Sequence, residues 1–384
     1  MKRKICLVIT TRGNYAKLKS VISHLQSDPG VELQLIVGGG AILPKYGTTA
    51  NTLISNDIKI DRVIHFLVEG ENPITMAKSA GLAITEFGTA FENLRPDAVV
   101  VIADRFESLA IAMTSTLMNI PVAHIEGGEV SGSVDESLRH AITKLAHLHF
   151  PATKQAAARI EHMGEDTGTI FPVGSTSIDV FKSLNLNDIG PVMEFQRTGG
   201  VGKIIDLTKL YIIVIQHPVT TEYEMNLAHI NETIEAIDTL QLPTVWIWPN
   251  MDAGSDGIAK GIRVFRENRK YTPVHFFKSL PVELFAPLLN NAACIVGNSS
   301  SGIREASFLG VPCVNIGSRQ NGRERGLNVV DVGNNRDEIH NAIKSQVEYD
   351  VFPPSAIYGN GQAGLKIAKI LKNFPLKIQK KIKY

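Results

Sequence analysis

Residues 98–107 read AVVVIADRFE, and this stretch indicates how the chain folds. An apolar, mostly β-branched run leads directly into a polar cluster, after which a helical pattern begins. A strand without polar alternation is buried on both faces, as in parallel sheets that helices cover on two sides. The same succession of apolar run, polar loop and amphipathic helix recurs along the chain. The predicted fold class is therefore α/β, with doubly wound sheets.

The apolar runs that are predicted to be strands fall into two groups. The first group is Ile5–Ile9, Leu33–Val37, Ala98–Ile102, Val122–Ile125 and Ile170–Val173, and the second is Tyr211–Ile215, Thr244–Ile247, Val274–Phe277, Cys294–Val296 and Cys313–Ile316. Between them lies an irregular stretch at 183–210, where Asn and Gly are frequent. We therefore expect two Rossmann-like domains, at 1–190 and 191–365, and a helix with a basic tail at 366–384 that could pack back on the first domain. Two such domains facing a cleft form the glycosyltransferase-B architecture, although the periodicity also allows other paired Rossmann-like arrangements.

Bulk composition excludes several classes of partner. A chain of 384 residues suits two domains, and 44% hydrophobic with 20% charged residues is ordinary for a soluble globular protein. The 39 basic and 38 acidic side chains nearly cancel, so nucleic acid and acidic membranes are not expected partners. The first apolar run is too short for a signal segment or a membrane span, which favours a cytoplasmic location. Three dispersed cysteines without a C-x-x-C pair are expected to be reduced thiols of the core.

Asp104 and Arg105 follow the predicted strand Ala98–Ile102 and are the first candidates for chemistry. Ligands of open α/β sheets bind at the carboxyl ends of the strands. A carboxylate next to a guanidinium can be held ionised there. The alternative is structural, because Asp104 also stands where an N-cap of the next helix would be.

The segment 124–129, HIEGGE, is the stronger candidate of the first half. Glu126 comes directly after the strand Val122–Ile125, and the two glycines behind it permit a ligand to approach the backbone closely. Asp135 and Arg139 lie four residues apart on the following helix and should share a face. Capping would explain Asp135 and an ion pair would explain Arg139, but neither explains Glu126. A functional role is therefore favoured for Glu126.

No metal and no cofactor are predicted. His140, His147 and His149 lie close in sequence, but no H-E-x-x-H or C-x-x-C motif accompanies them, so histidines satisfied by protein partners are favoured. A Walker A loop is absent from the sequence.

His217 follows the predicted strand Tyr211–Ile215, next to a proline that fixes the backbone. There it could donate to a phosphate or act as a general acid, or it could be a buried histidine of the core. Asn250 and Asp252 follow the strand Thr244–Ile247 in the same way, and an N-cap by Asp252 would be a complete structural explanation.

The most informative stretch of the second half is GNSSSGIRE at 297–305. A small polar turn between a strand and a helix offers backbone N–H groups and hydroxyls, which together bind anions. The candidate side chains are Asn298, Ser299, Ser300 and Ser301. Glu305 could accept hydrogen bonds from a ribose, or close a capping box with one of the serines. Arg319, the first of three closely spaced arginines, could help to clamp a diphosphate or lie in a solvated loop.

In this order, the motifs resemble those of the hydrolysing UDP-N-acetylglucosamine 2-epimerases, which serve sialic and legionaminic acid synthesis. The matching stretches, which span residues 10–361, are TTRGNY, ADRFE, HIEGGEVSGSVDESLRHAITKLAHLHF, QHPVTT, PNMDAGS, GNSSSGIREASFLGVPCVNIGSRQNGRERGLNV and IYGNG. The resemblance extends to the epimerase half of the animal bifunctional enzyme. It implies the glycosyltransferase-B architecture, with UDP held mainly by the second domain and without metal or NAD. The implied activity converts UDP-GlcNAc and water to N-acetylmannosamine and UDP, in a homodimer or homotetramer.

The resemblance also implies roles for individual residues. The carboxylates that would act as base, acid or cation stabiliser are Asp104, Glu126 and Asp135, with no assignment among the three. His217 and Arg139 would contact the diphosphate or assist its departure. Phosphate contacts are implied for Arg12, Ser299, Ser300 and Arg319, and a ribose contact for Glu305. The wider set of substrate-binding candidates adds Arg105, Asn250, Asp252, Asn298 and Ser301.

Several alternatives to this activity remain. The first loop reads Arg12-Gly13-Asn14-Tyr15, where the family usually has Arg-Ala-Asp/Glu-Tyr, and this loss of an acidic group makes a UDP-linked diacetamido-trideoxyhexose the close alternative substrate. A non-hydrolysing epimerase is disfavoured, because that group carries HVEAG-type and DSGG-type motifs in place of HIEGGE and GNSSSGIRE. A glycosyltransferase of the same fold would need the phosphate-binding residues too. An inactive nucleotide-sugar sensor is the non-enzymatic alternative.

Overall fold

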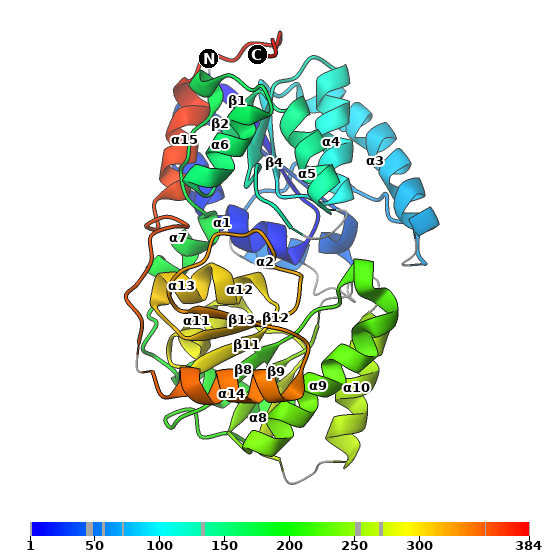
Figure 1. The fold of residues 1–384 in the computed structure, drawn as a ribbon. Helices are drawn as coiled ribbons and strands as arrows, with labels where there is room; N and C mark the ends of the chain where they lie inside the picture. Colours follow the sequence, from blue (N-terminus) through cyan, green and yellow to red (C-terminus); the bar gives the residue numbers. More distant parts are fainter. Residues whose placement is uncertain are drawn as a thin grey trace. The chain divides into compact units, whose positions relative to one another are not determined.

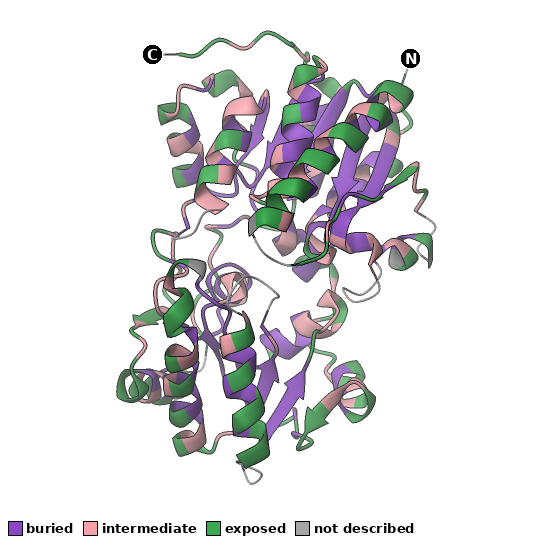
Figure 2. Ribbon diagram, turned by 90° about the vertical axis from the view of Figure 1, so that its right-hand side faces the viewer, coloured by how far each residue is buried: buried purple, intermediate pink, exposed green. Residues whose placement is uncertain are grey.

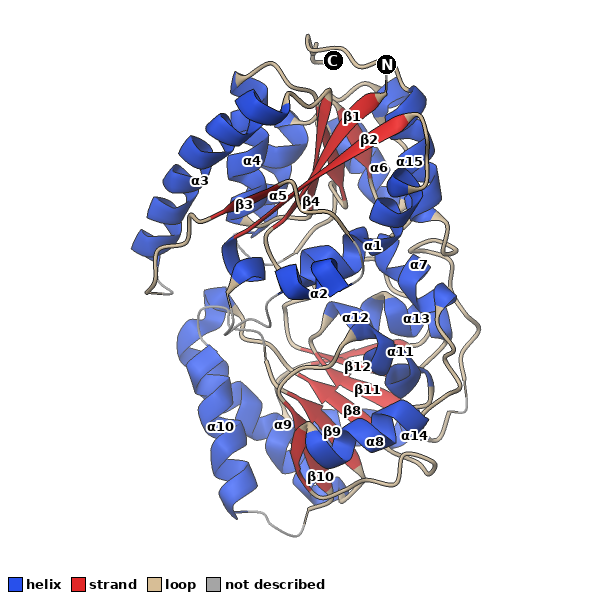
Figure 3. Ribbon diagram, turned by 180° about the vertical axis from the view of Figure 1, so that it is seen from behind, coloured by secondary structure: helices blue, strands red, loops and turns tan. Residues whose placement is uncertain are grey.

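The computed structural model describes residues 2–43, 49–55, 58–70, 73–131, 135–249, 255–268, 272–349 and 351–383. The chain forms two compact units (Figure 1). The first unit contains Met1–Val130, Val134–Val180 and Gly359–Tyr384, and the second contains Ser131–Ser133 and Phe181–Tyr358. Each unit is a mostly parallel sheet flanked by helices (Figure 3), which confirms the predicted α/β class.

The sheet of the first unit consists of parallel strands in the order β3-β2-β1-β4-β5-β6. The strands are β1 Arg3–Ile9, β2 Val31–Gly38, β3 Arg62–Ile64, β4 Ala98–Ile102, β5 Val122–Ile125 and β6 Leu148–Phe150. All residues of β4 and β5 are buried, as their unbroken apolar sequences require. The strand order reverses between β1 and β4, and such a switch point is where open α/β sheets bind ligands.

Helices cover both faces of this sheet. They are α1 Arg12–Gln26, α2 Thr49–Ser55, α3 Pro73–Leu94, α4 Phe106–Leu117, α5 Asp135–Leu145, α6 Lys154–His162, α7 Thr176–Ser183 and α15 Ala363–Asn373, with 3₁₀ turns η1 Gly39–Ile42 and η3 Thr167–Thr169. One cluster of buried side chains joins the sheet to α1 and α15, and another joins it to α3, α4 and α5. Figure 2 shows the buried residues concentrated in the strands and the exposed ones on the outer faces of the helices.

The chain returns to the first unit through α15. The carboxylate of Asp179 caps this helix, because it accepts hydrogen bonds from the N–H groups of Ala363 (2.9 Å) and Gly364 (2.6 Å). Ser20 on α1 donates to the same carboxylate at 2.7 Å. A Cβ on Gly364 would lie 2.1 Å from the Ser20 hydroxyl oxygen, so only glycine lets α15 approach α1 this closely. One acidic side chain thus joins α1, α7 and α15.

Buried charges also hold the C-terminal tail against the first unit. Glu165 accepts hydrogen bonds from Lys144 Nζ at 2.6 Å, Lys380 Nζ at 2.7 Å and His149 Nε2 at 3.1 Å. Burial by itself would raise the pKa of Glu165, but these three donors outweigh it and lower the pKa to about 2. Burial likewise lowers the pKa of His149 in spite of its carboxylate partner. An ionised Glu165 therefore contributes to holding Lys380 of the tail, whose Nζ also donates to the carbonyls of Lys144 and Ala146.

The sheet of the second unit has the order β13-β12-β11-β8-β9-β10-β7, with β7 antiparallel at one edge. The strands are β7 Gly200–Gly202, β8 Ile212–Ile215, β9 Thr244–Ile247, β10 Val274–Phe277, β11 Cys294–Gly297, β12 Cys313–Ile316 and β13 Val329–Val332. The helices are α8 Gly190–Thr198, α9 Asn226–Leu240, α10 Ser255–Asn268, α11 Val282–Asn290, α12 Ser300–Ile303, α13 Glu305–Leu309 and α14 Arg336–Val347, with a 3₁₀ segment η4 Thr220–Met225. The order reverses between β8 and β11, which is the switch point of this sheet.

The structure differs from the sequence-based expectations at a few places. The run Ile170–Val173 is no strand, because only Ile170 makes an isolated bridge, to His149. The short edge strands β3, β7 and β13 were not predicted, since their sequences lack a buried apolar run. The second unit begins at Phe181, which packs in its core.

The remaining sequence-based expectations concern thiols and membranes. All three cysteines are buried and unpaired, as predicted. Among the described residues, no helix has the length and apolar character needed to cross a bilayer.

Acid should weaken the first unit, and Glu165 should account for part of the effect. A carboxyl whose pKa is lowered from 4.5 to about 2 stabilises the fold above the unfolded-state value and loses that contribution as the pH falls toward 2. We expect Glu165→Gln to lower the free energy of unfolding by about 1–3 kcal/mol at pH 7 and to flatten its decline between about pH 5 and pH 3. Urea unfolding across this range measures the effect, with Glu161→Gln on the exposed surface of α6 as the control. An equally steep decline in Glu165→Gln would contradict the assignment.

Candidate active site

The strand ends of the first unit bring one group of predicted residues to the same edge of the sheet. Arg12 begins α1 just after β1, Asp104 follows β4, and Glu126 follows β5. These three strands are neighbours and run parallel, so their carboxyl ends lie side by side. Asp135 begins α5, and Arg139 lies about one turn further along the same helix.

A buried ion pair joins Asp104 to Arg139. The guanidinium of Arg139, a residue only 1% exposed, donates through Nη2 to Asp104 Oδ2 and through Nη1 to the carbonyl of Glu129 at 2.9 Å. A buried guanidinium stays charged and needs an ionised partner, so Asp104 is a carboxylate here. The N-cap interpretation of Asp104 is wrong, because Arg105 occupies the N-cap position of α4.

Both strand-end carboxylates lie at left-handed turns. Ala103, which precedes Asp104, has φ 61°, and Glu126 itself has φ 61°. This conformation costs a non-glycine residue about 1–3 kcal/mol and persists only where the surroundings impose it. Here Ala103 N–H donates to the Ile125 carbonyl at 2.9 Å, and Glu126 N–H donates to the Phe150 carbonyl at 3.0 Å. Backbone strain of this kind clusters at functional sites.

Glu126 is buried, and two side chains that the sequence analysis missed hold its carboxylate. Lys17 Nζ donates to Oε2 at 2.6 Å, and Ser175 Oγ donates to Oε1 at 2.7 Å. Ser177 Oγ lies 2.9 Å from Ser175 Oγ. Lys17 therefore neutralises Glu126, while Ser175 fixes its orientation. The available sequence signal was the position of Lys17 in the helix that Arg12 opens.

The other candidates of the first unit are more peripheral. Arg12 is half-buried at the start of α1, and the Arg105 guanidinium pairs with the buried Glu107 at 3.1 Å. Asn14 is buried, and its Oδ1 accepts a hydrogen bond from Thr10 Oγ1 at 2.8 Å. The amide thus ties the first loop to the end of β1.

In the second unit, Asn298 ties together the ends of two neighbouring strands. His217 N–H donates to Asn298 Oδ1 at 2.6 Å, and Asn298 Nδ2 donates to the His217 carbonyl at 2.8 Å. The Asn298 carbonyl accepts from Arg319 Nη1 at 3.1 Å and from Gln320 Nε2 at 2.8 Å. Asn298 therefore positions His217 and Arg319, and its side-chain amide is occupied in doing so.

His217 is a buried, neutral imidazole. Burial, and to a smaller extent the charge of Arg319, holds the pKa of His217 well below its usual value. A neutral ring can donate one hydrogen bond, for example to a phosphate oxygen. An anion bound nearby would raise the pKa of His217 and allow the ring to take up a proton.

The serine turn after β11 has the geometry that its sequence predicts. Gly297 has φ 123°, and a Cβ there would lie 2.1 Å from the Ile215 carbonyl oxygen, so only glycine lets β11 end beside β8 in this way. Ser299 caps α12, because its hydroxyl accepts a hydrogen bond from Ser301 N–H at 3.3 Å. Ser300 opens that short helix, and all three serines are half-buried.

Glu305 begins α13 and is buried with an unused acceptor. It is 7% exposed, and its Oε2 has no hydrogen-bond partner among the described residues. The capping box is not formed, because Ser299 caps α12 while Glu305 belongs to the next helix, whose N-cap is Arg304. A buried carboxylate oxygen without a donor is costly, unless a ligand supplies the donor.

The sequence contains one G-x-G-x-x-G spacing, GNGQAG at 359–364, but it does not form a dinucleotide site. The segment follows irregular chain instead of a strand, and the Asp179 carboxylate already occupies the N-terminus of α15. A dinucleotide phosphate would need that position.

The metal alternative also finds no support in the described part of the chain. No three His, Cys, Asp or Glu side chains there are arranged to hold a metal ion. His147 and His149 have protein partners, the Ile378 carbonyl and Glu165. Asn250 and Asp252 lie outside the described residues.

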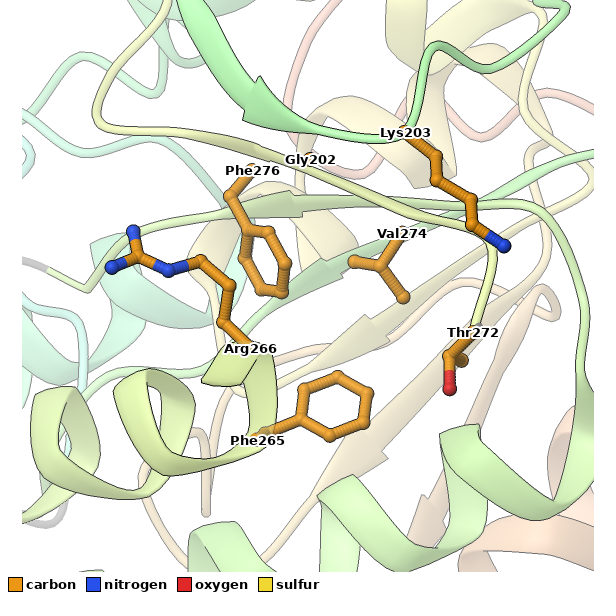
Figure 4. Close-up of a pocket in the computed structure, with 7 residues that line it drawn as sticks. All are labelled: Gly202, Lys203, Phe265, Arg266, Thr272, Val274 and Phe276. Carbon is orange, nitrogen blue, oxygen red and sulfur yellow. The ribbon is translucent and has the colours of Figure 1, made fainter. Parts of the chain in front are cut away.

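A hollow in the second unit lies away from the candidate residues. It is lined by Gly202, Lys203, Phe265, Arg266, Thr272, Val274 and Phe276 (Figure 4). Phe265 and Phe276, which line it, belong to the hydrophobic core, and the Thr272 hydroxyl donates a hydrogen bond to Asp238. The hollow adjoins β7 and β10, whereas the candidates of this unit that the structure describes follow β8, β11 and β12.

The known proteins that are similar to this chain include several 2-epimerases that act on UDP-linked sugars. A family profile described as "UDP-N-acetylglucosamine 2-epimerase" matches residues 23–372. A UDP-N,N'-diacetylbacillosamine 2-epimerase (hydrolyzing) from Legionella pneumophila is 34% identical over 379 residues, which cover 99% of this chain and 98% of the relative. A UDP-N-acetylglucosamine 2-epimerase from Neisseria meningitidis is 31% identical over 376 residues, which cover 97% of this chain and 96% of the relative.

One solved structure extends the comparison to the fold. The UDP-GlcNAc 2-epimerase from Neisseria meningitidis bound to UDP-GlcNAc has a TM-score of 0.80 at 19% identity, with 96% of this chain and 99% of that chain covered. The likeness confirms the predicted glycosyltransferase-B-like fold.

A double-mutant cycle tests whether Lys17 neutralises Glu126. We expect Lys17→Met to lower the free energy of unfolding by about 2–4 kcal/mol, because it leaves a buried carboxylate without its cation. In a Glu126→Gln background the same substitution should cost less than about 1 kcal/mol. Urea unfolding of the four proteins gives the coupling energy. Equal costs in the two backgrounds would show that the pair does not interact.

Proposed function

The chain belongs to the UDP-N-acetylglucosamine 2-epimerase family, and on that premise we propose that it is a hydrolysing enzyme that converts UDP-N-acetylglucosamine and water to N-acetylmannosamine and UDP. The observation that carries this proposal is the pair of carboxylates at neighbouring strand ends, Asp104 and Glu126, each joined to a cation. A protein that only bound a nucleotide sugar would need phosphate contacts. It would not need two ionised carboxylates held at strained turns.

The reaction requires a proton to leave one face of the sugar and another to return on the opposite face. A base removes the proton from C-2 while the bond between C-1 and UDP breaks, through a state with oxocarbenium character, and a glycal-like intermediate forms. Water then adds its hydroxyl to C-1, and C-2 receives a proton with the opposite configuration. The atoms balance with water as the only co-reactant. Inversion at C-2 therefore calls for two proton-transferring groups, one on each face.

We assign the chemistry at the sugar to the first unit. Asp104 and Glu126 are the two carboxylates whose charge a cation maintains, and Asp135 is the third acidic candidate. Arg139 and Lys17 keep the pair ionised side by side, so that one can accept the C-2 proton. Arg139 also carries positive charge that can stabilise the departing diphosphate.

We assign the nucleotide to the second unit. The unused Oε2 of Glu305 can accept a hydrogen bond from a ribose hydroxyl. The serine turn and Arg319 can hold the diphosphate, and the neutral ring of His217 can donate to a phosphate oxygen. Because bound diphosphate raises the pKa of His217, this ring can also take up a proton as UDP leaves.

A second substrate is favoured by a specific comparison. The Legionella pneumophila relative named for UDP-N,N'-diacetylbacillosamine is 34% identical to this chain, and its name also supports the hydrolysing outcome. Asn14, in place of an acidic residue, is consistent with a different sugar. The mechanism is shared, since both sugars have an acetamido group and a proton at C-2. We further propose that the enzyme works as a homodimer or homotetramer.

Incubation with UDP-N-acetylglucosamine in deuterated water tests the reaction. We expect free UDP and N-acetylmannosamine that carries deuterium at C-2, because the departing proton exchanges with solvent before hydration. Proton NMR measures both products. A product that retains its original C-2 proton would contradict the mechanism, and intact UDP-N-acetylmannosamine would indicate a non-hydrolysing epimerase. A parallel incubation with UDP-N,N'-diacetylbacillosamine identifies the preferred sugar by the higher kcat/KM.

Variants in the two units should separate chemistry from nucleotide binding. We expect Glu126→Gln and Asp104→Asn to lower kcat by about 10²–10⁴-fold while the affinity for UDP stays within about threefold. Glu305→Ala should instead weaken UDP binding by about tenfold or more, because the ribose loses its acceptor. Calorimetry with UDP and a UDP-release assay measure the two quantities, with Glu235→Gln on the exposed surface of α9 as the control. Full activity in Glu126→Gln would show that Glu126 is not one of the catalytic carboxylates.

A further inference from the structure

His124 is buried on β5, next to the strand ends that carry the two carboxylates. The residue is 0% exposed. Its Nε2 lies 2.8 Å from the Ala103 carbonyl oxygen, and its Nδ1 lies 3.2 Å from Thr143 Oγ1. We propose that His124 is a positioning residue, whose Nε2–H holds the Ala103 turn so that Asp104 is aimed at the sugar. This inference rests on the proposed function.

The chemistry of the two partners determines the tautomer of the ring. A carbonyl oxygen can only accept, so Nε2 carries a hydrogen. Burial lowers the pKa of His124 to about 4 in spite of the bond to Ala103, so the ring is neutral and has no second hydrogen. Nδ1 is therefore an acceptor. It lies 3.2 Å from Thr143 Oγ1, whose single hydrogen also points toward the Arg139 carbonyl oxygen at 3.0 Å. Because Nε2–H is held by the Ala103 carbonyl oxygen, His124 cannot give up this proton without breaking the contact that supports the turn.

The Ala103 turn needs this support because its backbone is strained. Ala103 has φ 61°, a conformation that a non-glycine residue keeps only where its neighbours impose it. Its N–H donates to the Ile125 carbonyl at 2.9 Å, and its carbonyl accepts from His124. The partners in both bonds are residues of β5, so the N–H and the carbonyl of Ala103 are each held by that strand. Without the imidazole donor the carbonyl would lose its partner, and Asp104, the next residue, could turn away from its functional orientation.

The same imidazole reaches the helix that carries the cation of the site. Thr143 lies on α5, four residues after Arg139, and Arg139 pairs with Asp104. His124 therefore links the turn that precedes Asp104 to the helix that neutralises it. A Cβ on Gly127 would lie 2.8 Å from His124 Nδ1 and 3.0 Å from Thr143 Oγ1, so glycine at this position leaves room for the contact.

Two substitutions of His124 separate positioning from acid–base catalysis. Glutamine keeps an N–H near the position of Nε2, whereas leucine has a similar bulk but no donor. We expect His124→Leu to lower kcat by about 10²-fold, with KM changed less than about threefold, and His124→Gln to recover at least about tenfold of that loss. The pH profile of kcat should keep both limbs in His124→Gln, because the ring transfers no proton.

His275 provides the matched control in the second unit. It is also a buried strand histidine, on β10, and its Nδ1 lies 3.0 Å from a backbone carbonyl, that of Lys203. His275→Leu should lower thermal stability about as much as His124→Leu does, yet leave kcat within about twofold of the wild type. A comparable loss of kcat in both leucine variants would show that His124→Leu acts by destabilising the protein in general, and would overturn the proposal.

Other outcomes are equally decisive. Equal losses in His124→Leu and His124→Gln, with one limb of the pH profile missing, would make His124 an acid or base instead. Nitrogen-15 NMR of the histidine rings tests the geometry without turnover: we expect Nε2 protonated, Nδ1 unprotonated and no titration between about pH 6 and pH 8. A titrating ring would overturn the assignment. Absence of UDP release by the wild type from either sugar would instead count against the proposed function.

Discussion

A guanidinium buried in the first unit constrains the residues around it. Arg139 cannot lose its proton inside a protein, and leaving it without an ionised partner would cost about 3–5 kcal/mol. Asp104 supplies the negative charge, and the Glu129 carbonyl takes a second N–H. One side chain thus fixes the turn after β4, the loop after β5 and helix α5 with respect to one another. The carboxylate that the proposed chemistry requires is held ionised by the same contact.

Glu126, the second carboxylate, is also paired with a cation, in this case Lys17. Two carboxylates in one site repel each other, and without compensation one of them would be protonated at neutral pH. Separate cations, Arg139 for Asp104 and Lys17 for Glu126, remove this conflict. Since the proposed inversion at C-2 needs groups on both faces of the sugar, the double pairing of buried Arg139 and half-buried Lys17 keeps both carboxylates available for it. The left-handed turns at Ala103 and Glu126 fix the backbone at both strand ends, and the proposed proton transfers require such a fixed orientation.

The sequence predicted what depends on local pattern and on strand order. Buried runs such as Ala98–Ile102 are strands, and the residues that follow them lie at one sheet edge because parallel strands align their carboxyl ends. Ile170–Val173 misled the prediction, since an apolar run also arises where a loop packs under a helix. The contacts of Lys17 and of His124 could not be predicted, because they join segments far apart in the chain and depend on which rotamers the core allows. The local sequence of Glu305 fits both a cap and a ligand contact, and of these two the structure excludes only the capping box.

A crystal structure of the chain with UDP and the product sugar would test most directly whether carboxylates of the first unit act on a nucleotide sugar held by the second. The account predicts the ribose within about 2.6–3.2 Å of a Glu305 carboxylate oxygen, and the sugar C-2 within about 3.5 Å of a carboxylate oxygen of Asp104 or Glu126. UDP bound elsewhere, or a sugar C-2 more than about 6 Å from both carboxylates, would contradict it.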